Sequence, residues 1–269
     1  MTIIYHSPIF GPVNSRRLGI SLGVNLQPGD GKVCTFDCIY CECGLNKDHR
    51  PLSPRPSREK VAKVLEETLC RMKQEGSGLD VLTFAGNGEP TGHPNFPDII
   101  KDTIALRDKY YPNAKVSVLS NATFIHRKEI RDALMLVDNN IQKLDTIDMD
   151  YIRLVDVPQQ PSYDVSKIID NLCHFNGHVI IQTMFMTGET KSMNHGNEGE
   201  TEGISVDNTS DTFVTPWLEA VKRIKPSQVM IYTIDRETPD PGLRKAPKEV
   251  LDAIRDKVIA AGIPCSASY

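Results

Sequence analysis

The chain has 269 residues, a length that fits one large α/β domain or two small domains and allows a substantial hydrophobic core. Its 31 basic and 35 acidic residues give a net charge of −4, so no global positive field indicates nucleic-acid binding. The sequence contains no run of about 18 apolar residues, and residues 1–6 lack the basic and apolar regions of a signal peptide. We therefore expect a cytoplasmic protein with no membrane partner.

Two local features add to these composition arguments. A basic patch could still bind RNA, although the net charge does not favour it, and its candidate residues are Arg16, Arg17, Lys47, His49 and Arg50. Seven cysteines, three of them close together, suit a reducing compartment better than a disulfide framework.

A cysteine-rich loop follows the first expected strand. Residues 8–17 contain Gly and Pro and indicate an extended lead-in. Residues 18–26 are expected to form a strand, and residues 27–31 are expected to turn the chain into the loop. The loop contains the pattern C-x3-C-x2-C, formed by Cys34, Cys38 and Cys41. Three thiolates this close together can reach three corners of a four-iron, four-sulfur cluster, and the fourth iron then has no protein ligand.

Other metals and chemistries are compatible with parts of this pattern. Cys38 and Cys41 alone form a C-x-x-C, which also occurs in redox dithiols, and Cys43 is near enough to be the fourth ligand of a zinc ion. Zinc sites, however, usually take their ligands from two separated pairs, and no second C-x-x-C or H-x3-H follows in the sequence. The spacing therefore favours the iron–sulfur cluster.

The loop resembles the signature of the radical S-adenosylmethionine (SAM) superfamily, with Tyr40 directly before the last cysteine. Residues 10–19, ahead of the cysteines, resemble an uncharacterised subgroup of iron–sulfur oxidoreductases that is similar to the wyosine-type tRNA-modifying members. The resemblance implies that Cys34, Cys38 and Cys41 bind a [4Fe–4S] cluster and that the backbone of Tyr40 contacts SAM.

The second expected strand leads into a glycine-rich loop. A helix from Ser57 to Gly76 precedes residues 81–85, which are nearly all apolar, as in a buried parallel strand. The following residues, Gly86-Asn87-Gly88-Glu89-Pro90, resemble the Gly-Gly-Glu-Pro motif of the superfamily, with Asn87 inserted. Glycines allow close approach of backbone carbonyls, and a carboxylate accepts hydrogen bonds from a cation. The resemblance implies that Gly88 and Glu89 bind SAM, with Glu89 facing its ammonium group; taken alone, the pattern is an ordinary loop.

Polar residues also lie at the ends of the next three expected strands. These strands cover residues 115–119, 141–144 and 178–186, and they alternate with expected helices at 94–110, 127–136 and 163–175. In the superfamily such residues contact SAM, although the polar pair at residues 120–121 is alternatively only a turn. The candidates are Ser120, Asn121, Asp145 with Lys143, and Gln182 with Thr183. Gln182 and Thr183 are both expected to point into a barrel interior and to contact SAM or substrate.

The C-terminal part of the sequence contains a polar segment and two further helices. Residues 188–210 are expected to form a flexible insertion, either solvated or acting as a lid or specificity loop, with His195 at the surface. Thr215 and Pro216 are expected to start a helix to Ile224, followed by a strand at 228–234 and a helix at 247–261. Cys265 alone lies beyond, so we expect no second cluster.

Six strands alternating with helices predict parallel βα units with right-handed crossovers. They match the partial (βα)6 TIM-like barrel of the radical SAM superfamily. We expect a single domain over residues 1–269, with a core at 18–261 and an N-terminal extension at 1–17.

The resemblance also implies the chemistry. An external electron donor, flavodoxin- or ferredoxin-like, would reduce the cluster, and SAM would be cleaved to methionine and a 5′-deoxyadenosyl radical that abstracts hydrogen from a substrate. Cys43 is a candidate hydrogen-atom donor. A non-catalytic iron–sulfur, zinc or electron-transfer protein is the alternative class. Within the enzymes, the sequence leaves tRNA modification, peptide modification and activation of a glycyl-radical enzyme open.

Overall fold

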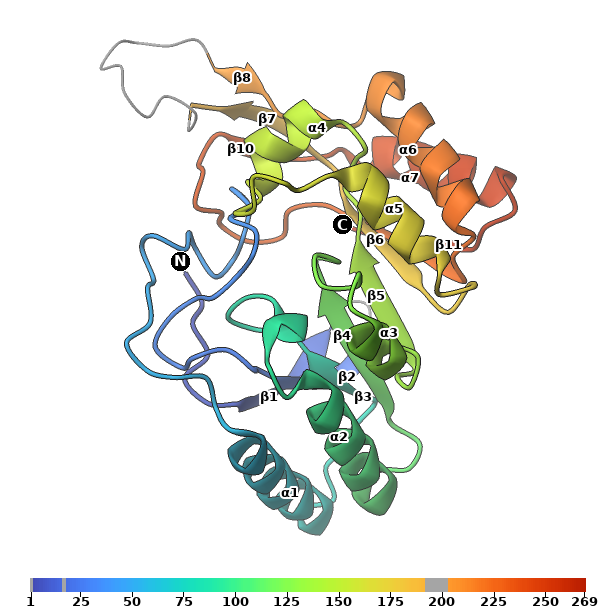
Figure 1. Ribbon diagram of the computed structural model, residues 1–269. Coiled ribbons are helices and arrows are strands. Elements are labelled where there is room, and N and C mark those ends of the chain that lie inside the picture. Colours follow the sequence, from blue (N-terminus) through green and yellow to red (C-terminus); the bar gives the residue numbers. More distant parts are fainter. Residues whose placement is uncertain (1, 16–17, 192–202) are drawn as a thin grey trace. The chain divides into compact units, whose positions relative to one another are not determined.

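The computed structural model describes residues 2–15, 18–191 and 203–269, which form two compact units (Figure 1). The N-terminal unit comprises Ile4–Thr35 and Asn46–Gln142. The C-terminal unit comprises Met1–Ile3, Phe36–Leu45 and Lys143–Tyr269. The cysteine loop is thus shared, with Cys34 in the N-terminal unit and the later cysteines in the C-terminal unit.

The sheet of the N-terminal unit has the strand order β1-β2-β3-β4-β5, in which β1 and β2 are antiparallel and the other neighbours are parallel. The strands are β1 (Ile9–Ser15), β2 (Gly19–Val24), β3 (Val81–Phe84), β4 (Lys115–Ser120) and β5 (Asn139–Lys143). The helices are α1 (Arg58–Gln74), α2 (Phe96–Tyr110) and α3 (Lys128–Leu134), and a short 3₁₀ turn covers Pro90–Gly92.

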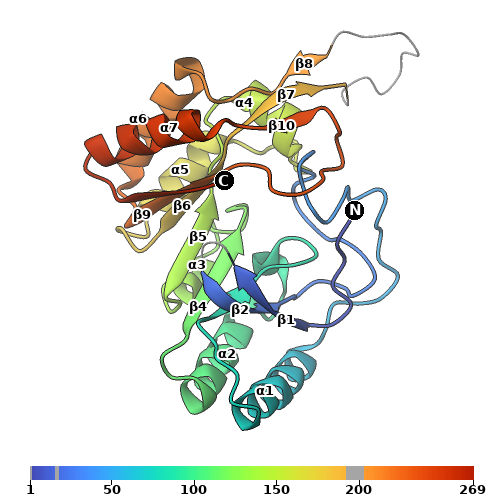
Figure 2. The same cartoon turned by 180° about the vertical axis from the view of Figure 1, so that it is seen from behind.

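One face of this sheet forms the core of the N-terminal unit. Leu22, Leu82 and Val116 lie side by side on neighbouring strands and are fully buried. The ring of Phe84 packs edge-on against Phe96 of α2, with 6.1 Å between the ring centroids. The helices α1, α2 and α3 lie along one side of the strands (Figure 1 and Figure 2). All four residues of β3 are buried, as its nearly continuous apolar run predicts for a parallel strand.

The C-terminal unit contains two sheets. The parallel sheet has the order β6-β9-β11, and the antiparallel sheet has the order β10-β7-β8. The strands are β6 (Ile180–Met184), β7 (Met186–Thr190), β8 (Ile204–Ser205), β9 (Gln228–Tyr232), β10 (Leu243–Lys245) and β11 (Cys265–Ser268). The helices are α4 (Met149–Tyr151), which runs into a π-helical segment (Ile152–Asp156), α5 (Val165–Cys173), α6 (Asp211–Ile224) and α7 (Lys248–Ala260).

The six expected parallel strands are confirmed as β2, β3, β4, β5, β6 and β9. The lead-in at residues 8–17 is more regular than predicted, because Ile9–Ser15 pairs with β2 as an antiparallel edge strand. Pro12 is tolerated there because an edge strand needs fewer backbone donors. Gly23 of β2 leaves room for the ring of Phe10, whose Cζ would lie 2.1 Å from a Cβ at this position.

The C-terminal unit differs from the expected elements at several points. The helix predicted from Thr215 begins one turn earlier, at Asp211, so that Pro216 lies inside it; the buried face formed by Val214 and Trp217 extends the amphipathic pattern. The strand β11 was not predicted, since its sequence Cys-Ser-Ala-Ser has no apolar run, but its backbone pairs with β9.

Another difference concerns the expected flexible insertion at residues 188–210. Part of this expectation is wrong, because β7 continues to Thr190 and pairs with β8, a strand too short to give a periodic signal. Residues 192–202, which include His195, lie outside the described residues, as do Arg16 and Arg17. Within the described ranges, no helix combines the length and apolar character needed to span a membrane.

Candidate functional site

All seven cysteines lie in described residues, and none of them is in a disulfide. Cys34, Cys38 and Cys41 are partly buried, and Cys43 is buried. Three reduced thiols on one loop have the donor chemistry that an iron–sulfur cluster requires. Among residues 2–15, 18–191 and 203–269, no three His, Cys, Asp or Glu side chains gather closely enough to hold a metal ion. The cluster ligands therefore stay a prediction from the spacing.

In the N-terminal unit, the glycine-rich loop is hydrogen-bonded to the chain that enters Cys34. The N–H of Val33 donates to the carbonyl of Asn87 at 2.9 Å, and the N–H of Glu89 donates to the carbonyl of Val33 at 3.2 Å. Between them, Gly88 has φ +128°, and a Cβ there would lie 2.0 Å from the carbonyl oxygen of Val33. The glycine of this motif is therefore needed for the close approach of two protein backbones.

Asn87, the residue by which the loop departs from Gly-Gly-Glu-Pro, is completely buried. Its side-chain amide donates to the carbonyls of Tyr5 at 2.9 Å and Pro28 at 2.8 Å. Its side-chain oxygen accepts the N–H of Tyr5 at 2.9 Å, and its own N–H donates to the side-chain oxygen of Asn25 at 3.1 Å. Asn87 thus attaches the loop to the N-terminal segment and to the turn after β2.

Glu89 is buried in a set of hydrogen-bond donors. One carboxylate oxygen accepts the N–H of Asn121 at 2.6 Å, and the other accepts the N–H and hydroxyl of Thr91 at 3.0 and 2.5 Å. Burial raises the pKa of Glu89, and these hydrogen bonds, including one from Ser120, oppose the increase. The carboxyl group is therefore held in one orientation at the carboxyl end of β3.

The turn after β4 brings predicted site residues together. The side-chain amide of Asn121 lies 3.6 Å from Sγ of Cys34 and 2.8 Å from the hydroxyl of Thr35. The hydroxyl of Ser120 accepts the N–H of Ala122 at 3.1 Å, and Ala122 has a left-handed backbone with φ +66°. Cys34, Glu89 and Asn121, far apart in sequence, thus form one connected site in the N-terminal unit.

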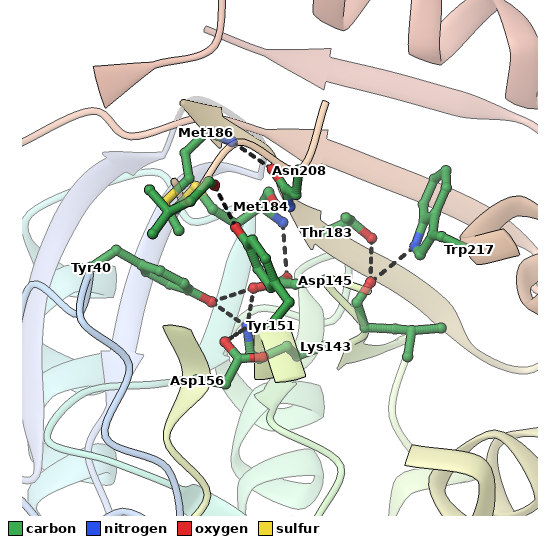
Figure 3. A network of polar contacts seen from close by, with 12 residues as sticks. Tyr40, Lys143, Asp145, Tyr151, Asp156, Thr183, Met184, Met186, Asn208 and Trp217 are labelled. Atoms are coloured by element: carbon green, nitrogen blue, oxygen red, sulfur yellow. Dashed lines mark hydrogen bonds and ion pairs between the residues drawn. The ribbon is translucent and has the colours of Figure 1, made fainter. Parts of the chain in front are cut away.

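In the C-terminal unit, four side chains form a charged cluster, in which two aspartates are buried and Tyr40 and Lys143 are partly buried (Figure 3). The hydroxyl of Tyr40 donates to the carboxylate of Asp145 at 2.5 Å, and Lys143 contacts both of these groups. Lys143 also pairs with Asp156 at 2.9 Å, and the N–H of Met184 donates to Asp145 at 2.9 Å. The structure therefore joins the predicted residues Tyr40, Lys143 and Asp145, and it adds Asp156.

Burial and charge act against each other in this cluster. Desolvation lowers the pKa of Lys143, but the negative charges of Asp145 and Asp156 outweigh it and raise this pKa well above its ordinary value. Burial raises the pKa of Asp156 to about 6, and the charge of Lys143 opposes the increase. Burial also raises the pKa of the Tyr40 hydroxyl well above its ordinary value. Lys143 is therefore an ammonium group, and its two carboxylate partners keep it charged.

The same unit holds the backbone of the cysteine loop against the π-helical segment. The N–H of Ile39 donates to the carbonyl of Val155 at 2.9 Å, and the N–H of Asp37 donates to the carbonyls of Asp156 at 3.0 Å and Val157 at 3.1 Å. Val157 has φ +46°, an unusual backbone for a β-branched residue. Such strain and π-helical turns are both frequent at functional sites. No periodic pattern marks this segment in the sequence, so its role was not predicted.

Gln182 and Thr183 are neighbours in β6, so the expectation that both point into a barrel interior is wrong. Successive residues of a strand point to opposite faces. The hydroxyl of Thr183 is buried and donates to the carbonyl of Leu144 at 2.8 Å, which the indole of Trp217 also contacts at 3.0 Å. Gln182 shares the other face with Met184 and stays a candidate for SAM binding.

Comparison with known proteins identifies a family. Residues 30–195 match the family model described as the radical SAM superfamily. A UPF0026 protein of Helicobacter pylori strain J99 is 31% identical over 249 residues, which is 89% of this chain and 69% of that protein. The chain spans between 30% and 69% of the length of the curated relatives that it matches.

Solved structures share the fold. Streptococcus suis SuiB bound to S-adenosylmethionine has a TM-score of 0.61 at 15% identity, over 92% of this chain and 50% of that chain. TYW1 with a lysine-pyruvate adduct bound has a TM-score of 0.57 at 13% identity, over 90% of this chain and 74% of that chain. The predicted partial (βα)6 TIM-like barrel of the radical SAM type is confirmed.

Proposed function

The chain belongs to the radical SAM superfamily, and we propose that it binds one [4Fe–4S] cluster and cleaves SAM reductively to act on a substrate through a radical. Membership of the superfamily implies an enzyme that uses SAM and an iron–sulfur cluster. The proposed cluster ligands are Cys34, Cys38 and Cys41. A cluster held by these cysteines would supply the electron for the reductive cleavage of SAM to methionine and a 5′-deoxyadenosyl radical.

The residues of this chain have positioning tasks in that reaction. Glu89 is proposed to accept hydrogen bonds from the SAM ammonium, for which its buried and oriented carboxylate is suited. The remaining candidates for SAM binding are Gly88, Ser120, Asn121, Asp145, Gln182 and the backbone of Tyr40. Cys43 stays a candidate hydrogen-atom donor.

One observation carries the proposal: the two superfamily motifs are hydrogen-bonded to each other. Val33, which precedes the first cysteine, pairs with the glycine-rich loop on both sides of Gly88. Asn121 then contacts Glu89 of one motif and Cys34 of the other. A zinc or electron-transfer site would need the cysteines but would give no reason for this buried carboxylate beside them.

The test is SAM cleavage by the anaerobically reconstituted protein with a strong reductant. We expect 5′-deoxyadenosine from the wild type and none from Cys38→Ala, because one ligand of the cluster is lost. Cys173→Ala, which removes a cysteine of α5 outside the loop, is the matched control and should keep the activity. Full product formation by Cys38→Ala would show that the cluster is assigned to the wrong cysteines.

The electron donor and the location belong to the same proposal. We expect a flavodoxin- or ferredoxin-like protein to reduce the cluster in the cytoplasm, where thiols stay reduced. Replacing the chemical reductant by a reduced flavodoxin in the same assay tests this. Formation of 5′-deoxyadenosine that depends on flavodoxin supports the proposal. The proposal is contradicted if the mixture with flavodoxin forms no 5′-deoxyadenosine and adding the chemical reductant restores its formation.

A further inference from the structure

The side-chain amide of Asn121 is directed at the sulfur of Cys34. Its nitrogen lies 3.6 Å from Sγ of Cys34 and 2.8 Å from the hydroxyl oxygen of Thr35. Asn121 is buried. A side-chain amide nitrogen has two hydrogens and accepts none, so it can donate one hydrogen to each of these two atoms.

The orientation of this amide follows from its other end. The side-chain oxygen of Asn121 lies 3.1 Å from the backbone N–H of Thr123 and 2.7 Å from the hydroxyl of Thr123. A backbone N–H can only donate, so the atom that faces it must be the amide oxygen. The amide nitrogen therefore faces Cys34.

The two threonines complete a closed ring of hydrogen bonds. Their hydroxyl oxygens are 2.7 Å apart. Since Thr123 donates its hydroxyl hydrogen to Asn121, Thr35 must donate to Thr123, and Thr35 in turn accepts from the amide nitrogen of Asn121. Each group in the ring donates once and accepts once, and such rings strengthen each bond. The ring uses one hydrogen of the amide nitrogen and directs the second toward Cys34.

We propose that Asn121 is a positioning residue that donates an N–H···S hydrogen bond to Cys34 and thereby raises the reduction potential of the cluster. Hydrogen bonds to the ligand sulfurs help to set the potential of iron–sulfur clusters, because they stabilise the more negative, reduced state. The backbone N–H of Asn121 also orients Glu89 at 2.6 Å. This inference rests on the proposed function, since it requires that Cys34 is a cluster ligand.

The test compares the potentials of reconstituted wild type and Asn121→Asp by redox titration with electron paramagnetic resonance. The aspartate keeps the acceptor for Thr123 and the backbone N–H to Glu89, but it has no hydrogen for Cys34. We expect the ratio of reduced to oxidised cluster at a fixed potential to fall by about tenfold, which is a shift of about 59 mV for one electron. Asn121→Ser is measured with the same criterion, because it loses the same hydrogen without adding a carboxylate, whose negative charge lowers the potential by itself.

Thr35→Val is the matched control. It has nearly the same shape and opens the ring, but it leaves the amide of Asn121 and its hydrogen toward Cys34 in place. The inference is supported if the ratio of reduced to oxidised cluster falls about tenfold in the Asn121 variant. In Thr35→Val the same ratio should stay within about twofold of the wild-type value. Equal potentials in wild type and the Asn121 variant, or equal shifts in both variants, overturn it. Wild-type protein that takes up no iron would instead overturn the proposed function.

Discussion

The two compact units hold the two ends of the cysteine loop with different chemistry. In the N-terminal unit, the side-chain amide of Asn121 faces the sulfur of Cys34 and is hydrogen-bonded to the hydroxyl of Thr35, which in turn contacts the hydroxyl of Thr123. In the C-terminal unit, Tyr40 is held by the charged groups of Lys143 and Asp145. One end of the loop is thus attached by neutral hydrogen bonds, and the other by a buried ion cluster.

This difference separates two tasks. Neutral donors close to a sulfur can shift the energy of a redox centre without the desolvation cost that buried charges carry. Buried charges, by contrast, are held strongly only while every partner is present, since one unpaired charge in the interior is expensive. We therefore expect substitutions in the charged cluster to reduce stability and substitutions near Cys34 to change the properties of the site.

The largest effect is expected from Lys143→Met, which leaves Asp145 and Asp156 buried without their cation. Breaking a buried ion pair on one side costs about 3–5 kcal/mol of unfolding free energy. Denaturant unfolding of the metal-free protein, followed by circular dichroism, measures the loss. Lys115→Met is the control, because Lys115 pairs with Asp138 at the surface, where such pairs contribute at most about 1 kcal/mol. Similar losses in the two variants would show that the cluster is not a special source of stability.

A smaller loss is expected from Gly88→Ala on the neutral side. The new methyl group would meet the carbonyl of Val33 at 2.0 Å, and the positive φ adds backbone strain. We expect a loss of about 3 kcal/mol, the upper end of the cost of one strained residue. The same unfolding assay applies. Gly76→Ala is matched to it, because Gly76 has φ +72° with nothing within 4 Å, and should cost only about 1–2 kcal/mol. A Gly88→Ala protein as stable as Gly76→Ala would contradict the tight pairing of the two motifs.

The smallest effect is a pH dependence that comes from Glu89. Its pKa is raised by burial above the ordinary value of 4.5, so the folded protein binds this proton more tightly than the unfolded chain. The wild type should therefore lose stability relative to Glu89→Gln as pH rises above 4.5. The total loss is about 1.4 kcal/mol for each unit by which the pKa of Glu89 in the folded protein exceeds 4.5. Unfolding curves of both proteins between pH 4 and pH 8 give the difference, with the loss complete above the folded pKa. A difference that is constant with pH would mean that Glu89 is not desolvated.

Much of the N-terminal half of the site could be predicted because parallel strands place their carboxyl ends at one edge. Glu89 follows β3 and Asn121 follows β4, so the apolar runs that end in polar residues predict that both lie at this edge, and the resemblance to the superfamily identified them as site residues. The direction of the Asn121 amide was beyond the sequence, since it depends on a turn with Ala122 in a left-handed conformation.

One residue of the charged cluster, Asp156, could not be predicted from the sequence. Lys143 and Asp145 lie at the end of an expected strand, but Asp156 lies in a π-helical segment that has neither strand nor α-helix periodicity. The strands β8 and β11 were missed because one has two residues and the other is mostly small and polar. Their positions are set by pairing with neighbouring strands, which is tertiary information.

The central claim is that the cysteine loop carries a cluster with one iron open to SAM. Electron paramagnetic resonance of the anaerobically reconstituted and reduced protein, with and without SAM, tests it most directly. We predict the signal of a reduced [4Fe–4S] cluster whose g values change when SAM is added, because SAM would bind an iron that the three cysteines leave without a protein ligand. A cluster signal that SAM does not alter, or a protein that binds zinc in place of iron, would contradict the account.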